Sequence, residues 1–284
     1  MQMISKSTPT VPSTVYLTLL YCLMKQLVPY INMHRGIICS WIQKKTQLIT
    51  FAYRKLLSKI DVNALLPVVI NGEKINYSNT VKYLGLTLNN TLTWSEHVHI
   101  VIKKVVSSMH SLRRNCYYLP LGVRRRLVET LIFPLIDYGQ LVYHDLGVTL
   151  DLRLQRIQNA CVRFIFNIKR DASISPFYRQ LNWLKLKERR LLACLLVTRR
   201  ILRERSPGYL FENHTLMSTV HKRSNRNTTS TMQIPIHSTV KYADSFLITS
   251  CKAFNTYSLM SVCDISDFTF TRKIISEFTG NYTC

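Results

Sequence analysis

The chain has 284 residues, and 38 Lys and Arg against 15 Asp and Glu give it a formal net charge of +23. A hydrophobic fraction of 47% is enough for one large or two modest domains and argues against disorder as the dominant state. The glycines are too widely spaced for a G-x-G-x-x-G or Walker A loop, which excludes these nucleotide-binding motifs. The charge favours an anionic partner, nucleic acid first, because binding to phosphates releases counterions.

The cysteines and the apolar stretches indicate the compartment. No two of the eight cysteines form a C-x-x-C pair, which argues against a local zinc site. Cys116, Cys161 and Cys194 lie within apolar helical patterns, so we expect buried free thiols in a reducing compartment. The longest N-terminal apolar stretch, Val15–Met24, is too short to cross a bilayer. We therefore expect an intracellular protein, cytoplasmic or nuclear, with no membrane partner.

The first 93 residues predict a loose lead-in followed by β structure. Residues 1–30 show no periodicity, and 37–51 are typical of a helix end that runs into a short strand, Gln47–Phe51. Val68–Ile70 and Val81–Leu88 are rich in β-branched residues, and Asn71-Gly72 is a turn signal between them. The span 65–88 is therefore predicted to be a β-hairpin.

Helical periodicity follows. Apolar residues recur at i, i+3 and i+4 steps in 95–112, 123–136, 150–166 and 186–203, which predicts four amphipathic helices. Residues 218–231 are polar and predict a loop or linker, and 232–284 predict mixed short elements. The expected fold class is α+β and predominantly α-helical.

Positive charge is concentrated in the helical block. Residues 101–206 hold 21 Lys and Arg against 7 acids, which is +14 of the total charge. Arg153, Arg156 and Arg163 share the helical face opposite the apolar one, where guanidinium groups can meet a phosphate backbone. The alternative is that such arginines are ordinary solvated faces, or stems that cover apolar surface. The candidate nucleic-acid-binding arginines are Arg113, Arg114, Arg124, Arg125, Arg126, Arg153, Arg156, Arg163, Arg189 and Arg190.

Several segments resemble, in order, the reverse transcriptases of non-LTR retrotransposons, particularly jockey-like insect elements. The sequence VKYLGL at 81–86 with Trp94 and His97 resembles their "KYLG…L.W..H" block. Residues 132–139 resemble "I.P.LDYG", 154–164 resemble "LQ..QN…R.I", and 181–190 resemble "L.WL….RR". Weaker likenesses are KTQ at 45–47, PGYL at 207–210 and YADSF at 242–246.

The resemblance implies a domain organisation. Residues 1–35 lie outside the family pattern, 36–93 correspond to the edge of the palm, 94–210 to a basic helical thumb, and 211–284 to a linker and tail. Lys45 falls in palm motif D. The hairpin corresponds to the primer grip, with Tyr83, Leu84 and Gly85 at its turn. Tyr83 is either a primer-contacting aromatic or a packed hairpin residue, and Tyr83 and Gly85 join the candidate binding residues.

The acidic residues decide the expected chemistry. The family uses two Mg²⁺ ions held by an earlier Asp and an adjacent Asp-Asp pair, and no two acids of this chain are adjacent. Asp244-Ser245 lacks the second carboxylate and follows Lys45, whereas the family's pair precedes motif D. We therefore expect a C-terminal fragment with no catalytic residues, no metal and no small-molecule substrate, inactive alone, that binds RNA or DNA, such as a primer–template duplex, without sequence preference.

Two alternatives remain open. In the first, the chain is a transposon relic without a selected function. In the second, it is a helical protein-interaction module whose basic faces only keep it in solution. Cooperative unfolding argues against the first, and failure to bind nucleic acid at low salt favours the second.

Overall fold

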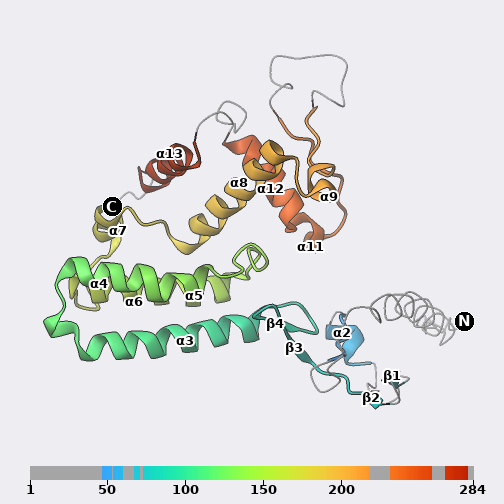
Figure 1. Cartoon of the computed structure of the whole chain (residues 1–284), viewed down its shortest axis with the longest axis horizontal. Coiled ribbons are helices and arrows are strands. Elements are labelled where there is room, and N and C mark those ends of the chain that lie inside the picture. The colour runs from blue at the N-terminus through green and yellow to red at the C-terminus, as the bar shows by residue number, and fades with distance from the viewer. Residues whose placement is uncertain are drawn as a thin grey trace, which may run out of the picture. The chain divides into compact units, whose positions relative to one another are not determined.

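A computed structural model of the chain describes residues 47–52, 54–59, 67–70, 73–217, 231–257 and 266–280 (Figure 1). Residues 1–35, Lys45, the Asn71-Gly72 turn and nearly all of the predicted loop 218–231 lie outside these ranges. The chain divides into two compact units, residues 1–48 with 60–78, and residues 49–59 with 79–284. The predicted thumb segment, 94–210, falls wholly within the second unit.

The first unit holds a small antiparallel strand pair. Strand β1, Val68–Ile70, pairs with β2, Glu73–Ile75, and Val68 lies opposite Ile75. The expected strand at Gln47–Phe51 is not formed, because within that segment only Leu48 makes a bridge, to Tyr77. A lone bridge leaves the neighbouring backbone groups without a ladder, so the β propensity of this segment is not realised.

The second unit begins with the short helix α2, Arg54–Leu57, and a second hairpin. Strand β3, Thr80–Tyr83, pairs with β4, Leu86–Asn89, and the loop between them has positive φ at both Leu84 and Gly85. Two-residue loops of this kind match the twist of antiparallel strands. The single hairpin predicted over 65–88 is therefore wrong: each β-rich run folds back on its own neighbour.

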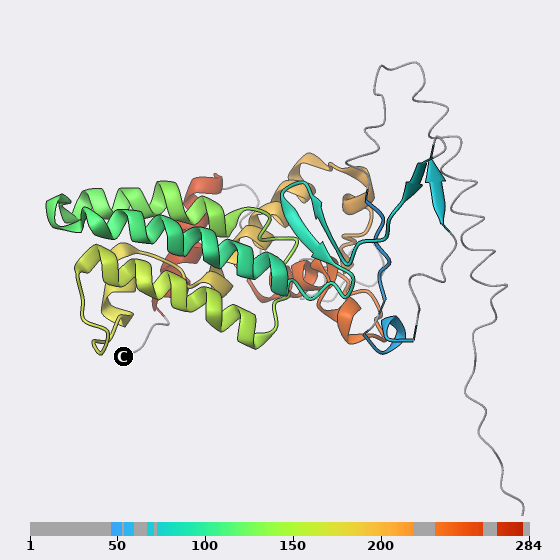
Figure 2. The same ribbon diagram turned by 90° about the horizontal axis from the view of Figure 1, so that it is seen from below.

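Three helical segments form most of the first core, to which Tyr178, Leu181, Trp183 and Leu186 also contribute. Helix α3, Ser95–Arg114, packs beside α6, Val148–Phe166, and both contact the stretch from α4, Leu121–Leu127, to α5, Phe133–Asp137 (Figures 1 and 2). The buried faces are the ones that the periodicity predicted, with Val101, Val105, Cys161 and Ile165 almost fully covered. Burial of such side chains contributes roughly 1.5–3 kcal/mol each.

The second predicted helix, 123–136, is interrupted. Between α4 and α5 the chain makes a π-helical turn, η5, Val128–Ile132, just before Pro134. Proline has no N–H to donate to the carbonyl four residues earlier, so a regular α-helix cannot run through this point. The extra residue of a π turn shifts the register, and Leu131, predicted on the apolar face, is half exposed.

A second core lies around α8, Leu186–Glu204, which follows α7, Ser175–Leu181. Helices α12, Phe246–Thr256, and α13, Asp267–Gly280, both contact α8, and the buried residues include Leu195, Phe254 and Phe270. The short helices α9, Gly208–Phe211, and α11, Val240–Ala243, also belong to the second unit. The predominantly helical α+β class is confirmed.

Candidate nucleic-acid interface

Three of the predicted arginines line one pocket. Arg113 comes from the end of α3 and Arg156 and Arg163 from α6, and a fourth, Arg170, comes from the loop after α6. The pocket has a volume of about 870 Å³, and none of its lining residues is acidic. We call this pocket, which Cys116 also lines, the arginine pocket.

The guanidinium groups of the arginine pocket are little engaged by the protein. Arg113, Arg156 and Arg170 are exposed and form no ion pair within the described residues. Arg163 donates from Nη2 to the backbone carbonyl of Arg170 at 3.1 Å, and its buried Nε has no partner among the described residues. Like charges held together without an acid repel each other, so a bound anion would be favoured here.

Arg170 is the member that the sequence analysis missed. Helical periodicity does not extend to Arg170, because α6 ends at Phe166 and the next residue, Asn167, adopts the left-handed conformation that often terminates helices. The chain reverses direction after Asn167, so Arg170 lies beside the end of α6, next to Arg163. The basic pair Lys169-Arg170 just after a helix end was the available signal.

Other candidates bond to the protein itself. Arg124 donates from Nε to the carbonyl of Leu119 at 2.7 Å and from Nη1 to that of Ile165 at 3.2 Å. The second contact satisfies a carbonyl at the end of α6, which otherwise has no helical partner. Arg125 pairs with Glu129 at 2.9 Å.

The Arg189-Arg190 pair faces the interior of the second unit. Arg189 forms a bidentate ion pair with Asp137 and lies 4.5 Å from the ring centre of Phe133. Arg190, only 6% exposed, pairs with Asp151. These contacts join α8 to α5 and to α6, which favours the structural alternative for both residues.

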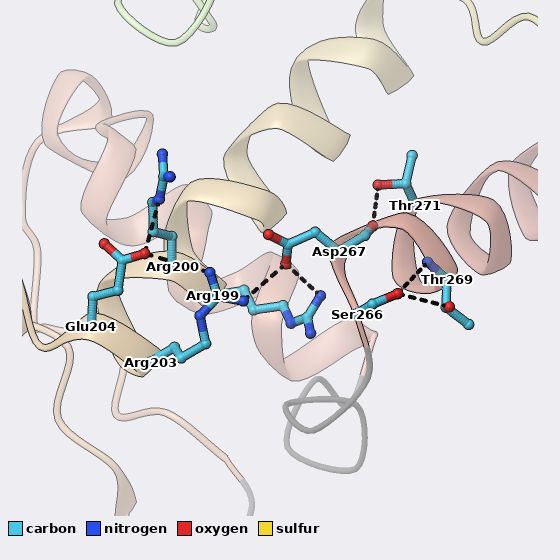
Figure 3. A network of polar contacts seen from close by, with 8 residues as sticks. All are labelled: Arg199, Arg200, Arg203, Glu204, Ser266, Asp267, Thr269 and Thr271. Atoms are coloured by element: carbon cyan, nitrogen blue, oxygen red, sulfur yellow. Dashed lines mark hydrogen bonds and ion pairs between the residues drawn. The ribbon is translucent and has the colours of Figure 1, made fainter.

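A similar network fixes α13 to α8 (Figure 3). The Asp267 carboxylate forms an ion pair with Arg199 at 2.8 Å and another with Arg203 at 3.4 Å. The Arg199 side chain is 1% exposed and lies 5.1 Å from the ring centre of Phe270. Because these guanidinium groups already pair with a carboxylate, they are poor candidates for phosphate binding.

Three candidates remain as exposed single charges. Arg114, Arg126 and Arg153 make no ion pair with any residue that the structure describes. None of them lines the arginine pocket. They can add to a positive field around the helices but do not form a site by themselves.

The β3–β4 turn presents Tyr83, which is 64% exposed. Gly85 has a structural role there: its φ is +81°, and a Cβ on it would lie 3.0 Å from the ring of Tyr138. The hydroxyl of Tyr138 donates to the carbonyl of Leu84 at 2.6 Å. Tyr83 is therefore exposed at the turn and is not a packed core residue of the hairpin.

The segments that carry the family resemblance meet in space. Tyr138, of the 132–139 segment, bonds to the 81–86 segment as just described, and Asp137 pairs with Arg189 of the 181–190 segment. Gln158, which is fully buried, donates to the carbonyl of Leu184 at 2.8 Å. Their polar residues therefore hold the elements together.

Trp183 and His97, which belong to the segments of resemblance, are buried in the structure. Trp183 is 4% exposed and donates from Nε1 to Glu129 at 3.0 Å. His97 is buried and accepts at Nδ1 from the backbone N–H of Thr87 at 3.4 Å, whereas His99 is exposed. Burial, and then the charge of Lys104, lower the pKa of His97.

The buried thiols are unreactive ones. Cys161 and Cys194 are free and buried, as predicted, and Cys116 is half-buried. Burial raises the pKa of Cys161 to about 12, although the charge of Arg113 acts in the opposite direction. A thiol with so high a pKa stays protonated at neutral pH, so Cys161 is a packing residue of the first core.

Neither a metal cluster nor a membrane span is found where the chain is described. No group of three or more His, Cys, Asp or Glu side chains there could hold a metal ion. No helix there is long and apolar enough to cross a bilayer. Comparisons with protein-family models, curated proteins and solved structures give no match to this chain.

Proposed function

We propose that the helical unit binds RNA or DNA through phosphate groups, with little preference for base sequence. The arginine pocket carries this proposal, because it gathers four guanidinium groups without an acidic side chain. Guanidinium forks match phosphate oxygens and give stronger hydrogen bonds than neutral donors. Contacts of this kind position a backbone and do not distinguish bases.

We further propose that the chain is a fragment of a non-LTR reverse transcriptase. In this assignment the β3–β4 hairpin is the primer grip and the helices from α3 onward are the thumb. The order of a hairpin followed by basic helices supports it, as do the contacts among the resembling segments. Because the sequence has no adjacent acid pair, we expect no polymerisation by this chain alone. Without the metal ions of the intact family, Lys45 would have no polymerisation reaction to assist.

The test is fluorescence-anisotropy binding to an RNA–DNA primer–template, a DNA duplex and a single strand across a salt series. Each phosphate contact with duplex DNA adds about 0.9 to the slope of log affinity against log salt. Arg113→Gln and Arg156→Gln should each weaken binding to duplex DNA and lower its slope by about that amount.

Arg200→Gln is the matched control, because it removes the same charge from an exposed arginine that already pairs with Glu204 at 3.2 Å. It should leave the slope nearly unchanged. Equal losses for pocket and control variants would mean that only the net charge matters and would reject the site. Undetectable binding at low salt would favour the protein-interaction module. Metal-dependent primer extension by the purified chain would overturn the proposed inactivity.

A further inference from the structure

Two adjacent tyrosines lie immediately after a residue of the arginine pocket. Cys116, which lines the pocket, begins the short 3-10 helix η4, Cys116–Tyr118, between α3 and α4. Tyr117 is 91% exposed and Tyr118 is 81% exposed. By contrast, the tyrosines that pack in the protein, such as Tyr143 and Tyr178, are 2% exposed. The η4 pair therefore contributes almost nothing to the core.

Backbone hydrogen bonds fix the turn from which these two side chains project. The N–H of Tyr118 donates to the carbonyl of Asn115 at 3.1 Å, and that of Leu119 donates to the carbonyl of Cys116 at 3.2 Å. The two rings meet edge to face, with their centres 5.4 Å apart. A fixed backbone limits the entropy lost when a ligand binds to these side chains.

We propose that Tyr117 and Tyr118 form a stacking platform for unpaired bases of a nucleic acid whose phosphates occupy the arginine pocket. This rests on the proposed nucleic-acid binding and adds that the preferred partner is a single strand or an overhang. Bases inside a duplex are already stacked on their neighbours, whereas an unpaired base has a free face for an aromatic ring. Aromatic rings beside a basic groove are the usual means of binding single strands without sequence preference.

Charge selects this ligand over an apolar protein surface. Arg113 and Arg114 precede the turn, and the pocket that Cys116 joins contains no acid. A partner at this place must therefore bring negative charge together with flat apolar faces. A nucleotide strand carries both in every unit.

The experiment compares the full chain with a Tyr117→Leu/Tyr118→Leu variant in binding to a single strand and to a blunt duplex of equal length. Base stacking is worth about 1–3 kcal/mol per base, so single-strand affinity should fall about 5-fold or more, with little change for the duplex. Tyr117→Phe/Tyr118→Phe keeps both rings and should retain the affinity. Tyr209→Leu, at another tyrosine that is 69% exposed, should have no effect.

Photocrosslinking with a 5-iodouridine single strand gives an independent reading of the contact, and the adduct should map to Tyr117 or Tyr118. Unchanged single-strand affinity in the leucine variant, with pocket variants still defective, would overturn the platform and leave the proposed function intact. No binding by the unmodified chain would overturn both. Tyrosine-dependent binding to anionic vesicles, with unchanged single-strand affinity, would assign the pair to a membrane surface and overturn the platform.

Discussion

Removing the Asp137 charge tests whether Arg189 supports the fold or contacts nucleic acid. Asp137 and Arg189 are each 26% exposed at the side chain and form two charge-assisted hydrogen bonds. Fully exposed pairs contribute about 0–1 kcal/mol, and breaking a fully buried pair costs about 3–5 kcal/mol. For this intermediate burial we expect Asp137→Asn to lower the free energy of unfolding by about 2 kcal/mol.

A double-mutant cycle isolates the pair. Asp137→Asn, Arg189→Gln and the double variant should show a coupling free energy of about 1–2 kcal/mol in urea unfolding followed by circular dichroism. The Phe133 ring keeps part of its contact with Arg189 in the Asp137→Asn variant, which limits the loss. Arg189→Gln should also leave the salt slope of nucleic-acid binding unchanged, because its guanidinium is already paired.

The matched control is the exposed pair Arg200–Glu204, whose side chains are 69% and 45% exposed. Its coupling should be about 0.3–0.5 kcal/mol and should be screened by salt. A coupling for Asp137–Arg189 no larger than this control, or a drop in salt slope for Arg189→Gln, would refute the argument. The two residues would then behave as surface charges.

Three further perturbations have definite expected results. Gly85→Ala places a Cβ at φ +81° and 3.0 Å from the Tyr138 ring, so it should lower the free energy of unfolding in urea by about 1–2 kcal/mol. Gly122 lies in α4, where an added Cβ would meet no atom within 4 Å, so Gly122→Ala should raise the free energy of unfolding by about 0.5–1 kcal/mol. Asp267→Asn should destabilise by about 2 kcal/mol and speed proteolysis around α13, because it leaves the buried Arg199 without its ion pair; an unchanged midpoint would contradict this. Burial, and then the charge of Lys104, lower the pKa of His97 in the folded protein, so the imidazole binds a proton more tightly in the unfolded chain. The free energy of unfolding should therefore fall as the pH drops below about 6.5, and His97→Gln should flatten this pH dependence.

The long helices were predictable because their packing follows the sequence period. The stretches 95–112, 150–166 and 186–203 correspond to α3, α6 and α8 to within two residues at each end. Helices α3 and α6 present their apolar residues to the first core, whereas α8 places Leu186 in the first core and its later leucines in the second. The periodicity does not reveal the π turn before Pro134, since a one-residue register shift leaves the apolar spacing almost unchanged.

The roles of the arginines were less predictable because their partners are distant in the sequence. Arg189 meets Asp137 from 52 positions away, and Arg190 meets Asp151 from 39 positions away. A basic doublet on a helix has the same appearance in sequence whether its partner is water, phosphate or a carboxylate. Only the packing of α8 against α5 and α6 separates these cases.

The positions of the acidic residues in the helical block show which of its arginines are paired with carboxylates. Of the seven acids in residues 101–206, at least five are in ion pairs with Lys or Arg: Glu129, Asp137, Asp145, Asp151 and Glu204. Asp137 and Asp151 pair with residues of α8, and Glu204 pairs within it. Asp137 and Asp151 thus neutralise arginines where helices join, whereas Arg113 at the end of α3 and Arg156 of α6 form no ion pair among the residues that the structure describes. The positive charge of this block is therefore unevenly opposed, because no carboxylate lines the arginine pocket.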